Sequence, residues 1–190
     1  MKPERMKMKI AKIILAAAVA AGTLFAVTGC GKNTKQKELD GVKQLKNICL
    51  YCKMYSGDHG DKFPDDFTQL SDYFLDSQDF ISPWDSKRTP SSNKIILQKN
   101  TSYVYVGKGM TEKFSPKCPI AFEKPDLLHK GTTNVVCMDG SVGNFKLPEI
   151  PKTSKEFAEM YFASGHGKGI PENEKMIVLA NAAAFDANME

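Results

Sequence analysis

The most regular pattern of apolar and polar positions in the chain lies between residues 39 and 64. Apolar side chains recur there every three or four residues, which places them on one stripe of an α-helix and leaves lysines on the other side. Gly57, Gly60 and Pro64 end this helix near Ser56. The predicted buried stripe consists of Leu39, Val42, Leu45, Ile48, Cys52 and Tyr55.

Strand-like segments follow from residue 94 onward. Short runs of aromatic and β-branched residues are typical of strands, and Asp139-Gly140 between two such runs is the strongest short hairpin signal. We therefore expect an antiparallel sheet of three to five strands, whose apolar face covers the helix stripe. The runs cover residues 95–97, 102–106, 118–122, 134–138 and 141–145.

The composition shifts after Pro148. Helices over residues 154–163 and 171–185 are expected there, with a glycine-rich break between them. The predicted fold class is α+β. An N-terminal amphipathic helix packs on a small antiparallel sheet over residues 38–147, and residues 148–190 form a partly helical C-terminal appendage.

The first 29 residues have the parts of a secretory signal peptide. A basic segment from Lys2 to Lys12 precedes an apolar run from Ile13 to Val27, as in exported proteins. This run is shorter than the about 20 apolar residues that a membrane span needs. We therefore predict export, and the mature chain outside the cytosol.

The run ends in Val27-Thr28-Gly29-Cys30, which resembles the lipobox of bacterial lipoproteins. The resemblance implies that Cys30 is lipidated, that the chain is cut before it, and that several acyl chains hold the protein on a membrane. Residues 30–37 then form a polar tether. The alternative is an ordinary signal peptide followed by a chance cysteine.

The net charge of +4 belongs to the leader. Residues 1–30 contain five basic residues and one acidic residue, which leaves 21 of each sign in the rest of the chain. A neutral mature chain does not suggest a basic surface for nucleic acid.

Four cysteines remain if Cys30 is lipidated, in a compartment that favours disulfides. Cys49 and Cys52 have the CxxC spacing of redox enzymes, but they fall in mid-helix, so buried small residues or a disulfide are favoured over thiol catalysis. Cys118 and Cys137 lie on neighbouring predicted strands, where a disulfide would contribute about 3 kcal/mol. Zinc bound by all four is a weaker alternative, because the second pair lacks CxxC spacing.

The loop over residues 57–66 is rich in carboxylates and turn residues, and Asp65 or Asp66 is expected to cap a short helix beginning near Phe67. Hard cations such as calcium bind oxygen ligands at this density, although the spacing is not that of an EF-hand. A solvated turn is the favoured interpretation. The calcium candidates are Asp58, Asp61, Asp65 and Asp66.

Residues 42–145 resemble pilin-like proteins of the His-x9-Asp-Gly type, which are related to type II secretion pseudopilins. His129 and Asp139-Gly140 keep the signature spacing of nine intervening residues. The other matching motifs come in the family's order: Leu45-Lys46-Asn47-Ile48, Asp58-His59-Gly60-Asp61-Lys62-Phe63-Pro64, Phe80-Ile81-Ser82-Pro83-Trp84-Asp85 and Ser102-Tyr103-Val104-Tyr105.

The resemblance implies a pilin-type headpiece made of one helix and an antiparallel sheet. Pseudopilins begin with a long apolar helix that carries a Glu near its start, whereas here the apolar run ends at the lipobox. Assembly into a fibre is therefore not expected. A catalytic pair of His129 and Asp139 is disfavoured, because no nucleophile comes in a recognisable motif.

We expect a membrane-anchored, non-catalytic binding or structural protein without a cofactor. One alternative is an accessory of a type II secretion or pilus apparatus, with secretion or pilus proteins as partners. The other is a thiol oxidoreductase that uses Cys49 and Cys52.

Overall fold

The computed structural model describes residues 34–189 except Leu75 and Lys130. The predictions for the signal peptide and for lipidation of Cys30 lie outside these residues. The chain divides into two compact units, residues 1–36 and 37–190, and the second unit carries the features below. No helix within the described residues combines the length and apolar character that a membrane crossing requires.

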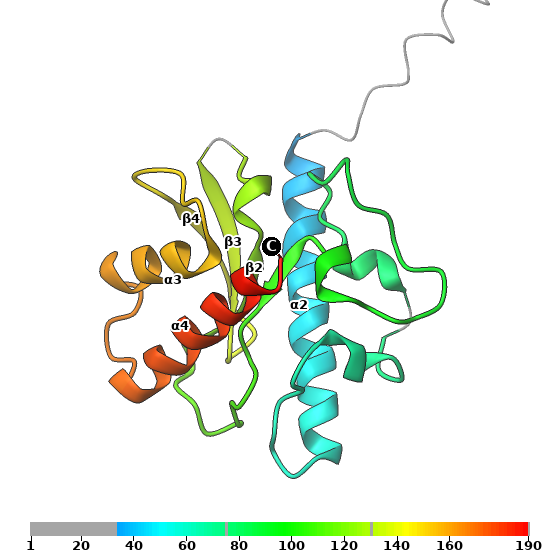
Figure 1. Cartoon of the computed structure of the whole chain (residues 1–190), viewed down its shortest axis with the longest axis horizontal. Helices are drawn as coiled ribbons and strands as arrows, with labels where there is room; N and C mark the ends of the chain where they lie inside the picture. Colours follow the sequence, from blue (N-terminus) through cyan, green and yellow to red (C-terminus); the bar gives the residue numbers. More distant parts are fainter. Residues whose placement is uncertain (1–33, 75, 130, 190) are drawn as a thin grey trace, which may run out of the picture. The chain divides into compact units, whose positions relative to one another are not determined.

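The first helix, α2 (Thr34–Asp58), is the long amphipathic helix that the sequence predicts (Figure 1). It already begins within the expected tether. Its buried side is rotated from the predicted stripe, because Leu39 is 55% exposed whereas Gln44 is buried. The buried positions of α2 are Gly41, Gln44, Leu45, Ile48, Cys49, Tyr51, Cys52 and Ser56.

The sheet contains four antiparallel strands in the order β1-β2-β3-β4, within the predicted range of three to five. Gly140 adopts a φ of 78° in the turn between the last two strands, as the Asp-Gly signal predicts. The strand expected at residues 95–97 does not form, and that segment leads into a short 3-10 helix, η3 (Gln98–Asn100). The strands are β1 (Tyr103–Tyr105), β2 (Pro119–Glu123), β3 (Thr132–Cys137) and β4 (Val142–Lys146).

Both faces of the sheet are covered. Tyr103 pairs with Glu123, and their side chains turn toward α2, where the Tyr103 hydroxyl donates to Gln44 Oε1 at 2.8 Å. Neighbouring positions point the other way, as strand geometry requires, and Phe122 contacts Phe157 with ring centroids 4.3 Å apart. The α+β prediction is confirmed, with helices on both faces of one sheet.

The second face is covered by α3 (Ser154–Ala163) and α4 (Glu172–Ala187), the two helices predicted after Pro148 (Figure 1). The helices were expected, but their integration in the core was not. Phe157, Tyr161, Val178, Ala182 and Phe185 all belong to the buried core. The C-terminal segment therefore completes the domain instead of extending from it.

Three further 3-10 turns connect α2 to the sheet and the second strand to the third. Asp66 caps η1 (Phe67–Leu70), which is the short helix expected after the acidic loop. The other two are η2 (Ser77–Phe80) and η4 (Pro125–Leu127).

Candidate functional site

The four cysteines of the described residues are free, buried thiols. The disulfide expected between Cys118 and Cys137 is not formed in the structure. Cys137 Sγ lies 3.6 Å from the Tyr161 hydroxyl, and Cys49 Sγ lies 3.8 Å from the carbonyl oxygen of Cys137. Each of these sulfur atoms therefore has a polar neighbour other than a second sulfur.

Burial sets the protonation of these thiols. It raises the pKa of Cys49 to about 11 and that of Cys118 to about 12, and it also raises the pKa of Cys52 and Cys137. A thiol that attacks a disulfide needs the opposite shift, because the thiolate is the nucleophile. The environment therefore supports the buried structural interpretation of the CxxC pair.

The carboxylates of the acidic loop serve separate local roles. Asp66 accepts a hydrogen bond from the Thr68 N–H at 2.7 Å, and Asp58 accepts one from the Tyr73 hydroxyl at 3.0 Å. Asp61 has a φ of 65°, which short polar residues tolerate in turns. Among the described residues, no group of three or more His, Cys, Asp or Glu could hold a metal ion. The structure thus gives these residues, Asp65 included, no shared site for calcium.

The signature residues His129 and Asp139 lie beyond opposite ends of β3. Asp139 closes the hairpin turn by accepting from the Ser141 N–H at 2.9 Å, and it forms an ion pair with Lys117 at 3.1 Å. His129 instead stacks on Trp84, with ring centroids 3.9 Å apart and planes 10° from parallel. The structure does not bring the two residues together as a catalytic pair.

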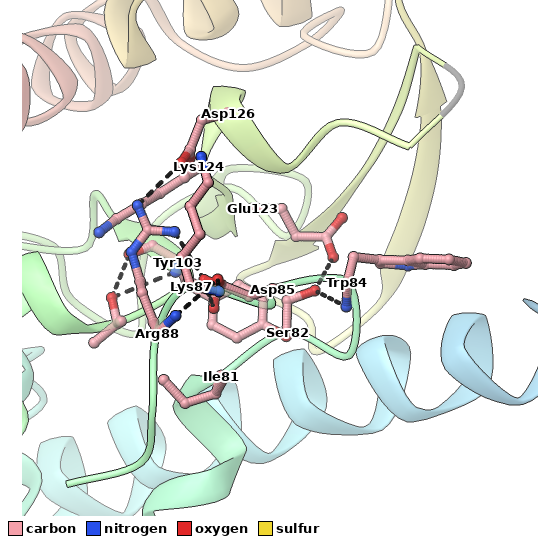
Figure 2. A network of polar contacts seen from close by, with 12 residues as sticks. Ile81, Ser82, Trp84, Asp85, Lys87, Arg88, Tyr103, Glu123, Lys124 and Asp126 are labelled. Atoms are coloured by element: carbon pink, nitrogen blue, oxygen red, sulfur yellow. Dashed lines mark hydrogen bonds and ion pairs between the residues drawn. The ribbon is translucent and has the colours of Figure 1, made fainter. Parts of the chain in front are cut away.

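A polar network joins the loop after η2 to the residue just before β1 (Figure 2). Asp85 accepts hydrogen bonds from the Ser102 hydroxyl and from Arg88 Nη1, both at 2.7 Å. The other amino group of Arg88 forms an ion pair with Asp126 at 3.1 Å. Burial alone would raise the pKa of Asp85, but these hydrogen bonds outweigh it and lower the pKa to about 2.

A second group of polar contacts lies between the sheet and α2. Glu123 accepts from the Ser82 hydroxyl at 3.0 Å and from the backbone and side-chain nitrogens of Asn134 at 3.0 and 3.3 Å. Ser82 Oγ in turn accepts from the backbone N–H of Trp84 at 3.3 Å. Burial raises the pKa of Glu123 despite these donors. Through Ser82, this carboxyl group positions the backbone that carries Trp84.

Lys124 is buried beside the first network. Its amine donates to the carbonyl oxygens of Gln98 at 3.0 Å and Lys99 at 3.3 Å, and it lies 5.3 Å from the ring centroid of Phe185. Burial and the nearby Arg88 lower the pKa of Lys124 to about 8. The amine of Lys124 is held by two backbone carbonyl oxygens of η3 and by the ring of Phe185 on α4. It therefore links the end of β2 to both segments.

A surface hollow of about 220 Å³ opens next to the Trp84–His129 stack. The amine of Lys37 lies 5.0 Å from the centroid of the Trp84 ring, within the range of a cation–π contact. Small-molecule sites are larger, about 300–1,000 Å³, so this hollow suits one side chain of a partner. It is lined by Trp84, Ser86, Lys87, Asp126, Leu127, Leu128 and His129.

The sequence pointed to parts of this site without assembling it. Trp84 and Asp85 belong to one family-like motif and His129 to another. The 44 residues between Trp84 and His129 keep the two rings apart in the sequence, and only folding stacks them. Arg88, Glu123 and Asp126 carried no signal, because isolated charged residues in loops and at strand ends are common. A buried charge becomes recognisable only when its partners are known.

Comparison of the chain with family models, with curated proteins and with solved structures found no match in any of the three. The resemblance of residues 42–145 to pilin-like proteins therefore stays a prediction from the motifs.

Proposed function

We propose that this chain is a lipid-anchored, extracytoplasmic protein whose pilin-like headpiece binds a partner and has no catalytic role. The lipobox ending in Cys30 supports the anchor. The arrangement of α2 on an antiparallel sheet is compatible with the family resemblance. The proposal places the binding surface at the hollow beside Trp84.

One observation carries the binding role: Trp84 is a half-exposed indole held in place by a buried polar scaffold. The backbone N–H of Trp84 donates to the Ser82 hydroxyl, which donates to the buried Glu123, and the indole ring is stacked on His129. Tryptophan is enriched among residues that dominate binding energies. An indole fixed beside a hollow loses little side-chain entropy when a partner binds, which favours association.

Mass spectrometry of the mature N-terminus tests the anchor. We expect a chain that begins with an acylated Cys30. Cleavage near Thr23, with residues 24–29 retained and no acyl group, would contradict the proposal and would indicate a fibre subunit instead.

Cross-linking in cells followed by affinity capture tests the binding surface. We expect Trp84→Ala, and separately Lys87→Glu, to reduce the recovered partner at least about tenfold, a loss typical of an interface hot spot. Ile150→Ala is the matched control, because Ile150 is 68% exposed and does not line the hollow. Equal loss with all three variants would contradict the assignment. Recovery of secretion or pilus subunits would favour the accessory role in such an apparatus.

Thiol trapping separates these proposals from a thiol oxidoreductase. The buried thiols with raised pKa should react with iodoacetamide at least about 100-fold more slowly in the folded chain than in urea, because both access and thiolate fraction are low. Rapid labelling of Cys49 or Cys52 in the folded chain would favour the redox alternative.

A further inference from the structure

The outward side of α2 carries lysines interleaved with large apolar side chains. A helix turns about 100° per residue, so residues three, four and seven apart share one side. Leu39, Leu50 and Met54 on this side are 55, 53 and 46% exposed. We call this surface the α2 stripe, and it consists of Leu39, Lys43, Lys46, Leu50, Lys53 and Met54.

The charged side chains of the α2 stripe are all positive. The stripe contains three lysines and no carboxylate. Glu38 and Asp40 each lie about 100° around the helix from Leu39, and Asp40 borders the stripe beside Lys43. Within the described part of the chain, none of the ion pairs involves a lysine of the stripe. The surface is therefore complementary to a negatively charged partner.

A second copy of the helix does not fit this surface. Two copies packed along the stripe would bring Lys43 and Lys46 against the same residues of the partner, and like charges at a helix seam are destabilising. Three exposed apolar residues are also fewer than a coiled-coil seam requires over this length.

The stripe lies close along the chain to the predicted acyl anchor. Three residues separate Cys30 from Thr34, the first residue of α2. Each residue of extended chain spans at most about 3.6 Å, so α2 begins within about 14 Å of the acylated cysteine. The anchor therefore keeps the first turn of α2 near the lipid headgroups.

We propose that the α2 stripe docks on the anionic lipid headgroups of the membrane that holds the acyl chains, an inference that rests on the proposed lipid anchor. The lysine amines pair with lipid phosphates, and the three apolar side chains enter the boundary between headgroups and acyl chains. Three lysines bind such a surface weakly by themselves. The anchor makes the contact intramolecular, so a weak attraction suffices to hold the helix down.

Lysine footprinting of the purified mature chain tests this inference without a substitution. The acylated chain is reconstituted in vesicles of phosphatidylcholine alone or with 30% phosphatidylglycerol and treated with an amine-acetylating reagent. We expect acetylation of Lys43, Lys46 and Lys53 to fall at least about threefold in the anionic vesicles and to recover in 0.5 M salt, because salt screens exposed charges. Lys108 and Lys113 are exposed internal controls, whose labelling should not change.

A pair of charge-matched variants gives an independent reading. Lys43→Glu/Lys46→Glu/Lys53→Glu should abolish the lipid-dependent protection of α2, read from its amide hydrogen exchange. Lys99→Glu/Lys108→Glu/Lys113→Glu, with the same change in charge at other exposed positions, should retain it.

Three results would overturn the docking. The first is equal acetylation in the two kinds of vesicle. The second is equal loss of protection in both triple variants. The third is protection that persists without vesicles and requires a co-purified acidic protein. Acylation of Cys30 is checked by mass spectrometry beforehand, so failure of the anchor is distinguished from failure of the docking.

Discussion

Glu123 illustrates how one buried residue can hold several segments together. Its two carboxyl oxygens accept hydrogen bonds from Ser82, in the loop that carries Trp84, and from Asn134, on β3. Gly41 of α2 lies against the same group, since a Cβ built at Gly41 would be 3.8 Å from Glu123 Oε1. Loss of the acceptor would leave buried donors without partners, which costs about 1–3 kcal/mol for each group.

Substitutions of Glu123 should therefore show how much of its contribution to stability comes from its hydrogen bonds and how much from its size. We expect Glu123→Leu to lower the free energy of unfolding by about 2–4 kcal/mol, because the Asn134 N–H loses its acceptor. Glu123→Gln keeps an acceptor oxygen and should stay within about 1 kcal/mol of the parent by the same argument. Urea unfolding at neutral pH measures both, and equal stability of the two variants would contradict this role.

Glu123 also contributes to the pH dependence of stability. Its pKa is raised in the folded state, so the folded chain holds this proton to higher pH than the unfolded chain. The stability that the proton provides is lost as the pH rises above the ordinary Glu value and through the folded pKa. The Gln side chain in Glu123→Gln cannot ionise, so this variant should not lose stability from position 123 as the pH rises.

Asp85 shows the opposite pH behaviour. Its pKa falls from an ordinary 3.8 to about 2 in the folded state, so its stabilisation is complete above the ordinary value and is lost as the pH falls through about 2. We expect Asp85→Asn to lower the free energy of unfolding by about 1–2 kcal/mol at pH 7. The deficit should shrink between about pH 4 and pH 2 as the parent residue becomes protonated.

Urea unfolding of parent and variant at pH 7, 4 and 2.5 measures this trend. Asp72→Asn serves as the matched control, because Asp72 is exposed. A deficit of Asp85→Asn that does not change with pH would show that the ionised carboxylate is not the source of the stabilisation.

Among the helices and strands, the pair α3 and α4 depends on a contact between their ends. Asp186, near the end of α4, accepts from the backbone N–H groups of Ser154 and Lys155 at 2.9 and 3.0 Å. These donors belong to the first turn of α3, where amide groups lack partners within the helix. A carboxylate at this end also interacts favourably with the helix dipole.

Removal of this contact should loosen α3 before it affects the sheet. We expect Asp186→Ala to lower the free energy of unfolding by about 1–2 kcal/mol, in the range of a lost helix cap. Amide hydrogen exchange at Ser154 and Lys155 should accelerate. Asp186→Asn retains an acceptor without the charge and should fall between parent and Asp186→Ala, whereas identical exchange in all three would contradict the cap.

In the second unit as a whole, stability requires cover on both faces of the sheet. Phe145 contacts Tyr161 of α3 with ring centroids 4.9 Å apart, and Asn181 of α4 donates to the carbonyl oxygens of Val106 and Lys108, both at 2.8 Å. Without α3 and α4, one apolar face of the sheet would meet water.

Deletion of residues 148–190 tests this dependence. We expect the shortened chain to lose its cooperative unfolding transition and to bind the dye ANS, because an apolar sheet face becomes exposed. Deletion of residues 188–190 should leave the transition within about 0.5 kcal/mol of the parent, as for surface changes. A cooperative transition in the longer deletion would show that residues 38–147 fold without the C-terminal helices.

The elements were predictable where their signals are local. The period of α2, the Asp139-Gly140 turn and the capped start of η1 each depend on residues close together in the chain. The site around Trp84 was not predictable to the same degree, because Trp84, Glu123 and His129 lie far apart in the chain.

The sequence by itself determined the α+β class, four of the five predicted strand positions and both C-terminal helices. The lipid anchor at Cys30 stays a prediction from the lipobox. Only the tertiary structure decided which side of α2 is buried, with Gln44 inside and Leu39 outside, and that the four cysteines among the described residues are free. The physical reason is that periodicity reports local backbone geometry, whereas burial and hydrogen-bond partners depend on segments that meet only in the folded chain.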